Sequence, residues 1–77
     1  MAELHLSTYQ NDNGTRVADV MKDKYHYIVR MQARHYGMMK EYRTVLLENK
    51  SELYAENTAE NFVLGIGPFE HLDWEGR

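Results

Sequence analysis

The sequence predicts a small α+β domain: an antiparallel sheet of two to four strands, with one C-terminal helix at about residues 51–64 packed on one face. Three observations support this prediction. Several segments alternate apolar and polar side chains, as half-buried strands do. The segments "NDNG" (11–14) and "HYGM" (35–38) are turn signals, because Asn and Gly tolerate positive φ. A segment with helical spacing then runs from Ser51 to a Gly-rich stop.

Length and composition limit the classes of protein. The chain of 77 residues is expected to form a single domain over 1–77, and it contains no cysteine. Disulfides and thiolate zinc sites are therefore excluded, and self-association is the most available support for so small a core. No segment approaches the roughly 20 apolar residues of a membrane span, and the N-terminus does not resemble a signal peptide. We expect a soluble, cytoplasmic protein with no membrane partner.

The N-terminal part contains one strand and one ambiguous segment. "ELHLSTYQ" alternates, with Leu4, Leu6 and Thr8 on one side, and reads as a short strand. The segment 15–24 has two interpretations. Thr15 could cap a short helix, or the segment could pair back on the first strand as a hairpin. The sequence leaves both open.

The middle of the chain predicts a second hairpin. In "YHYIVRMQAR" we expect one set of side chains in the core, namely Tyr25, Tyr27, Val29, Met31 and Ala33. The opposite face would hold His26, Ile28, Arg30, Gln32 and Arg34. After a turn at Gly37, "MKEYRTVLLEN" returns as a strand rich in Thr, Val and Leu. The alternative is one long helix over 15–47, against which Gly37 and the β-rich ends weigh.

The helix over 51–64 has signals at both ends. Ser51 is a good N-cap, and Gly65 or Gly67, followed by Pro68, ends the helix. Its spacing predicts a packing face made of Tyr54, Ala55, Thr58, Ala59, Phe62 and Ile66.

The helix also repeats the triplet Ala-Glu-Asn, which places Glu56 and Glu60 one turn apart on its flank. We interpret these carboxylates as a solvated surface, because no third metal ligand has a suitable spacing and an exposed pair would not have split pKa values. The four histidines show no ligand spacing, and "GIG" (65–67) follows a helix instead of preceding one, unlike a phosphate loop. We therefore expect no catalytic, cofactor or metal site, and a protein that is not an enzyme.

Charge is divided unevenly along the chain. The net charge is −2 over residues 1–21, +4 over 22–43 and −5 over 44–77. Apolar residues outside the predicted core suggest a surface for a second copy or another protein, and these are Leu53, Leu64, Phe69, Leu72 and Trp74. The last three belong to a tail, residues 67–77, that we expect to dock on the domain or on a partner. The main prediction is a protein-interaction module that forms a homodimer, binds another protein, or does both.

The basic segment supports an alternative function. A hairpin face with Arg30, Arg34, Lys40 and Arg43, and with His26 and Tyr36 nearby, could bind single-stranded nucleic acid through phosphate charge and base stacking. The acidic charge of the whole chain weakens this alternative.

Four short stretches within 49–65 carry a resemblance: Asn49-Lys50-Ser51, Tyr54-Ala55-Glu56, Ala59-Glu60-Asn61 and Val63-Leu64-Gly65. Together with "YHYIVRM" they resemble small uncharacterised proteins of marine cyanobacterial phages. This resemblance implies a phage accessory protein that acts in the host cytoplasm, and it transfers no catalytic or binding residue.

Overall fold

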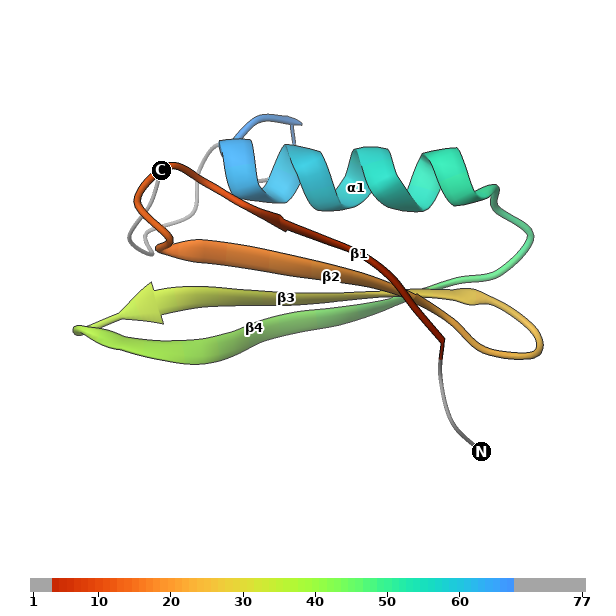
Figure 1. The fold of residues 1–77 in the computed structure, drawn as a ribbon, viewed down its shortest axis with the longest axis horizontal. Helices are drawn as coiled ribbons and strands as arrows, with labels where there is room; N and C mark the ends of the chain where they lie inside the picture. The colour runs from red at the N-terminus through yellow and green to blue at the C-terminus, as the bar shows by residue number, and fades with distance from the viewer. Residues whose placement is uncertain (1–3, 68–77) are drawn as a thin grey trace.

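A computed structural model describes residues 4–67 of the chain (Figure 1). Its elements follow in the order β1 (Leu4–Gln10), β2 (Arg16–Lys22), β3 (Tyr27–His35), β4 (Met38–Leu47) and α1 (Glu52–Leu64). The strands form one antiparallel sheet in the order β1-β2-β3-β4, so each strand pairs with the next along the chain.

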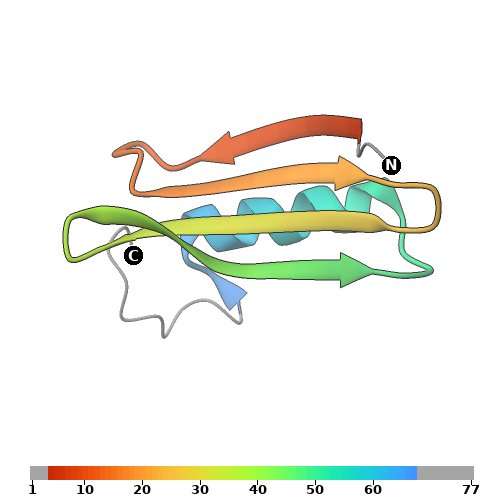
Figure 2. The same ribbon diagram turned by 90° about the horizontal axis from the view of Figure 1, so that it is seen from below.

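Figures 1 and 2 show α1 lying across one face of this sheet. The predicted α+β class is confirmed. The long helix over 15–47 is wrong, and the hairpin interpretation of the segment 15–24 is the correct one, because that segment contains β2.

The β1–β2 loop is organised by one side chain. Asn11 Oδ1 accepts hydrogen bonds from the backbone N–H groups of Thr15 (2.8 Å) and Arg16 (3.0 Å), and Asn11 Nδ2 donates to Thr15 Oγ1 (2.8 Å). Gly14 has a φ of 68°. The turn predicted from "NDNG" is thus present, and it aligns β2 with β1.

The β3–β4 hairpin has a two-residue turn between His35 and Met38, which pair with each other. Tyr36 and Gly37 have φ values of 53° and 79°, as a type I′ turn requires. Gly adopts this conformation without strain, whereas Tyr rarely does. The turn predicted at Gly37 is confirmed.

Both predicted helix ends are confirmed. Ser51 Oγ accepts a hydrogen bond from the N–H of Tyr54 (3.1 Å), as an N-cap does. Gly65 is left-handed with a φ of 71°, and its N–H donates to the carbonyl of Phe62. The N–H of Ile66 donates to the carbonyl of Asn61 (3.0 Å), which completes a Schellman motif.

The core lies between the sheet and α1. Its buried members are Ala18, Val20, Val29, Met31, Ala33, Ala55, Ala59, Phe62 and Val63. Two alanines in the middle of the helix face bring α1 close to the sheet, and the ring of Tyr42 stacks on that of Phe62 with centroids 5.7 Å apart. Thr58 is half-buried, Tyr54 and Ile66 are exposed, and Val63 is buried although it was not predicted.

The helix is rotated toward β1 relative to the prediction, since Glu56 on its flank bonds to β1. This rotation carries Val63 into the core and leaves Tyr54 at the rim. Ile66 lies beyond the last helical residue.

Two strand predictions need correction. A bulge between His5 and Ser7 breaks the alternation of β1, so Leu6 packs on the core while Thr8 pairs with Asp19 on the opposite face. Tyr25, expected in the core, lies in the β2–β3 loop and is 78% exposed. The core face of β3 is otherwise as predicted.

A charged side chain is buried with this core. Arg16 is fully buried, its Nη1 donates to the carbonyl of Phe62 (2.8 Å), and its guanidinium lies 5.3 Å from the centre of the Phe62 ring. The C-terminal end of a helix carries partial negative charge, so it is a favourable place for a cation. Arg16 thereby ties β2 to the last turn of α1.

Candidate interaction surfaces

The strand β4 forms one edge of the sheet and extends past the cover of the helix. α1 packs mainly on β1, β2 and β3, and Figure 2 shows β1 and β4 at the two edges. Only Tyr42, Val45 and Leu47 of the ten residues of β4 are half-buried, and the others are exposed. Because an edge strand presents backbone N–H and C=O groups that the sheet does not use, β4 is accessible to a further strand.

The four cations of the predicted nucleic-acid face do not share one face. Arg30 pairs with Thr44, and Arg34 pairs with Met39, on the face without the helix. Lys40 and Arg43 instead pair with two core residues, Ala33 and Met31, so they lie on the helix side of β4.

The pairing from the turn places Lys40 opposite Ala33, and the bulge opposite Met31 and Gln32 places Arg43 on the same side. This bulge adds one residue to β4, which shifts the alternation of side chains along that strand. Strict alternation counted from Lys40 would therefore place Arg43 on the wrong face, the one that holds Arg30 and Arg34.

Exposed apolar side chains gather at the β3–β4 turn. Tyr36 is 88% exposed, and Met38 and Met39 follow it with large exposed fractions. This turn projects beyond the end of α1 in Figures 1 and 2. The hairpin is the most prominent extension of the described chain.

An acidic stripe, defined as Glu52, Glu56 and Glu60, runs along the flank of α1 next to β1. The hydroxyl of Tyr9 donates to Glu56 Oε1 (2.5 Å), and the hydroxyl of Ser7 donates to Glu56 Oε2 (3.1 Å). The pKa of Tyr9 rises to about 12, first because its O–H donates to Glu56, then because of desolvation and the negative charges of the stripe. The pKa of the Glu56 carboxyl is lowered, chiefly by the same bond.

The solvated flank predicted for the repeated triplet is therefore only half correct. Glu60 is exposed, whereas Glu56 is half-buried and bonded to the sheet. Its role is to attach α1 to β1.

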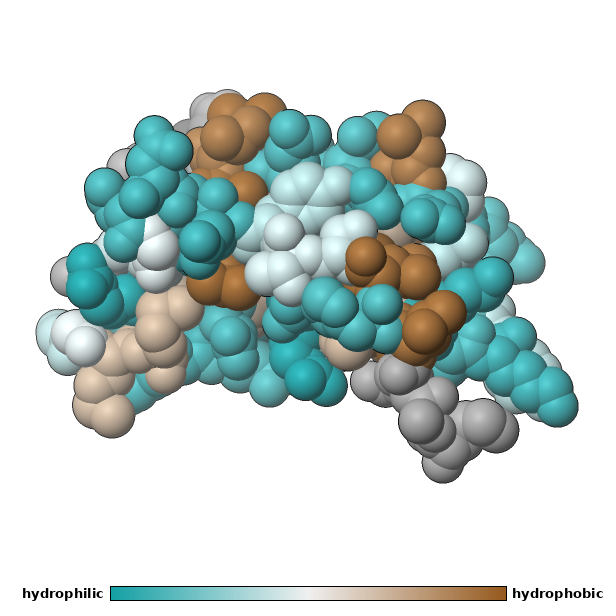
Figure 3. Space-filling view, in the orientation of Figure 1, coloured by the Kyte–Doolittle hydropathy of each residue, from teal (hydrophilic) through white to brown (hydrophobic). Residues whose placement is uncertain are grey.

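The two predicted partner-binding residues that the structure describes, Leu53 and Leu64, are not brought together. Leu53 and Leu64 are 70% and 57% exposed and lie near opposite ends of α1. Figure 3 shows separate brown apolar patches divided by hydrophilic surface on this side of the molecule. Phe69, Leu72 and Trp74, with nearly all of the predicted tail, lie outside the described residues.

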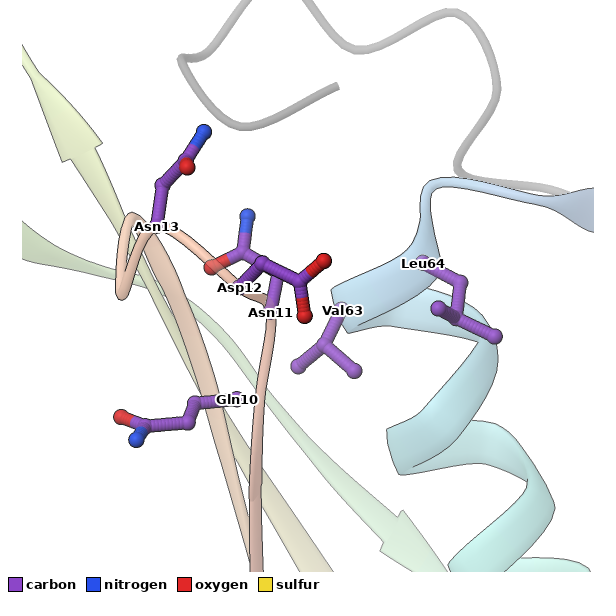
Figure 4. Close-up of a pocket in the computed structure, with 6 residues that line it drawn as sticks. All are labelled: Gln10, Asn11, Asp12, Asn13, Val63 and Leu64. Carbon is purple, nitrogen blue, oxygen red and sulfur yellow. The ribbon is translucent and has the colours of Figure 1, made fainter.

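A shallow hollow of about 250 Å³ lies between the β1–β2 loop and the end of α1 (Figure 4). Its lining residues are Gln10, Asn11, Asp12, Asn13, Val63 and Leu64. The side chain of Asn11 already serves the loop, as described above, and the hollow contains one carboxylate, from Asp12. Such a lining suggests no particular ligand chemistry.

A polar cluster lies on the face of the sheet without the helix. His5 Nε2 is 2.8 Å from Thr8 Oγ1 and 3.3 Å from Asp19 Oδ1, and the hydroxyl of Thr8 donates to Asp19 (2.7 Å). A hydrolytic triad would place the imidazole between nucleophile and acid, using both ring nitrogens. Here one nitrogen faces both groups, so the cluster acts as a cross-strand hydrogen-bond network.

The remaining chemistry of residues 4–67 is limited. No group of three or more His, Asp or Glu side chains there could hold a metal ion, and no helix there is long and apolar enough to cross a membrane. Sequence patterns could not identify the bond between Glu56 and Tyr9 or the burial of Arg16, because both depend on contacts distant along the chain. No protein-family model, curated protein or solved structure matches the chain.

Proposed function

We propose that this protein is a non-enzymatic interaction module that associates with other copies of itself through the edges of its sheet. The observation that supports this proposal is the exposed edge strand β4, whose ten residues extend past the cover of α1. An edge of this length offers a complementary strand a ladder of backbone hydrogen bonds, and each bond satisfies a group that otherwise faces water.

The size and composition of the chain give independent support. A domain of 77 residues without cysteine has a small core and no disulfide, and association would add buried surface. Leu46 on β4 is 58% exposed and would lose that exposure against a neighbouring strand. A cytoplasmic location and a relation to phage accessory proteins are further parts of this proposal, and they rest on the sequence alone.

Light scattering coupled to size exclusion tests the proposal over a range of concentrations. We expect a wild-type molar mass above the 9.1 kDa of one chain that rises with concentration. Leu46→Lys should lower this mass toward that of a monomer, because it places a charge at the edge. Leu53→Lys is the matched control, since Leu53 is also an exposed leucine, at 70% against 58% for Leu46, but lies on α1.

Two results would oppose the proposal. A wild-type protein that is monomeric at every concentration would exclude self-association. Dissociation by Leu53→Lys, with Leu46→Lys behaving as wild type, would move the contact from the sheet edge to the helix.

A second candidate function is binding of single-stranded nucleic acid by the β3–β4 hairpin. The favouring observation is the exposed ring of Tyr36 at the turn, with Arg34 and Lys40 on the adjoining strands, because bases stack on such rings and cations bind phosphates. Titration of a labelled oligonucleotide at low and high salt tests it, and affinity should fall steeply with salt. Equal binding by Arg30→Glu/Arg34→Glu would count against this function.

A further inference from the structure

We infer that the partner of β4 is the β1 edge of the next copy of the chain, so that copies join head to tail into one continuous antiparallel sheet. This inference rests on the proposed self-association and specifies its geometry. Two other arrangements were possible in principle, β4 against β4 and β1 against β1, and each would give a closed dimer.

Strand direction permits the head-to-tail arrangement. Three successive antiparallel pairings make β1 and β4 run in opposite directions. A second copy in the same orientation, moved sideways past β4, therefore presents its β1 antiparallel to β4. The shorter strand, β1, has seven residues, and the bulges of β1 and β4 divide a ladder between them into shorter runs. The helices of both copies then lie on the same side of the extended sheet.

Charge favours the same arrangement. Lys40 and Arg43 are exposed on the helix side of β4, which α1 of their own copy leaves largely uncovered. The acidic stripe of Glu52, Glu56 and Glu60 follows the flank of α1 beside β1, because its members are spaced four residues apart and Glu56 bonds to Tyr9 and Ser7 of β1. In the joined sheet, the stripe of one copy adjoins the two cations of the next. Opposite charges thus meet across the contact.

The closed alternatives bring like charges together. Pairing of β4 with β4 would place Lys40 and Arg43 of two copies in one small area, and pairing of β1 with β1 would bring two acidic stripes together. Like charges placed opposite each other at an interface disfavour association. The charges and the bulge of β4 are also the devices by which natural edges reject unselected strands. A complementary edge is therefore required.

A head-to-tail contact need not close on itself. Because sheets twist, successive copies rotate relative to one another. The contact then generates either a closed ring or an open filament of copies. We expect molar mass to grow stepwise with concentration past that of a dimer.

Charge reversal on the two edges tests this inference by light scattering. The basic edge is reversed in Lys40→Glu/Arg43→Glu, and the acidic edge is reversed in Glu52→Lys/Glu60→Lys. Glu56 stays unchanged because it bonds to Ser7 and Tyr9. Each variant alone should raise the apparent dissociation constant at least about tenfold, which corresponds to about 1.4 kcal/mol. An equimolar mixture should restore association, since each contact then joins opposite charges.

A control variant carries the same change in net charge as Lys40→Glu/Arg43→Glu, but away from both sheet edges. Lys24→Glu/Arg34→Glu alters the β2–β3 loop and the face without the helix, and it should associate as wild type does. Far-UV circular dichroism of every variant verifies that the fold is retained.

The outcomes separate the two proposals. If wild type associates but Glu52→Lys/Glu60→Lys associates equally well, β4 pairs with β4 and the head-to-tail inference is overturned while self-association stands. Normal association of Lys40→Glu/Arg43→Glu, failure of the mixture, or loss of association in the control would overturn it too. A monomeric wild type would remove both.

Discussion

The bond between Tyr9 and Glu56 offers a direct test of how α1 is held on the sheet. Tyr9→Phe removes only the hydroxyl that donates to Glu56 Oε1 at 2.5 Å, and the half-buried ring stays in place. A hydrogen bond to a charged group contributes about 1.5 to 3 kcal/mol when it is shielded from water. Since the phenol is partly in contact with solvent, we expect a loss of about 1 kcal/mol at pH 7.

The raised pKa of Tyr9 predicts how the stability that this residue contributes depends on pH. A rise from 10.0 to about 12 corresponds to about 2.7 kcal/mol at full strength, and solvent screening reduces this to about 1 kcal/mol. The folded pKa lies above the unfolded one, so this contribution is fully present below pH 10. It is lost as the pH rises from 10 to 12, because the unfolded state releases the proton first.

Urea unfolding followed by far-UV circular dichroism measures both effects. With a slope of about 1 kcal/mol per molar urea, the midpoint of Tyr9→Phe at pH 7 should lie about 1 M below that of wild type. The difference between the two proteins should shrink between pH 10 and 11. Tyr36→Phe is the control, since its side chain is 88% exposed. Equal midpoints for Tyr9→Phe and wild type at pH 7 would refute the assigned role of the bond.

Two further substitutions test the core and a turn. Phe62→Ala removes a fully buried ring and should lower the free energy of unfolding by about 3 to 5 kcal/mol. This loss is enough to abolish a cooperative thermal transition in circular dichroism. Leu53→Ala is the control, because its side chain is exposed, and it should change the free energy of unfolding by less than about 0.5 kcal/mol. Tyr36→Asn should raise the melting temperature by about 4 °C, since relief of a strained left-handed residue gains about 1 kcal/mol. A lower melting temperature for Tyr36→Asn would show that the tyrosine is not strained in the turn.

The elements with local signals were predictable from the sequence. The turn and cap signals form contacts only with residues close by in the sequence, so they can be identified without knowledge of the rest of the chain. These signals are "NDNG", Gly37, and Ser51 with Gly65. The alternation of β3 is similarly local, and its core face from Tyr27 to Ala33 was correct.

The ambiguity of β2 has a physical cause. Its core residues, Ala18 and Val20, continue a face that begins with Arg16. A charged residue at a core position hides the period of two, and Met21 next to Val20 then fits helical spacing equally well. Only the end of α1, distant along the chain, explains why arginine is stable there.

The candidate surfaces were less predictable because bulges and long-range contacts determine them. One bulge in β4 places Arg43 on the face opposite that of Arg30 and Arg34. The partners of Glu56 lie 47 and 49 residues away in the sequence, and no helical spacing encodes them.

The consecutive pairing of the strands has a consequence for how the chain folds. Each hairpin closes a short loop, whereas the attachment of α1 joins residues 46 and 49 positions apart, Arg16 with Phe62 and Ser7 with Glu56. Contacts that close long loops cost more chain entropy and form more slowly. We therefore expect the sheet to assemble first from its hairpins, with Val20, Val29 and Met31 still in water, and the helix to dock last.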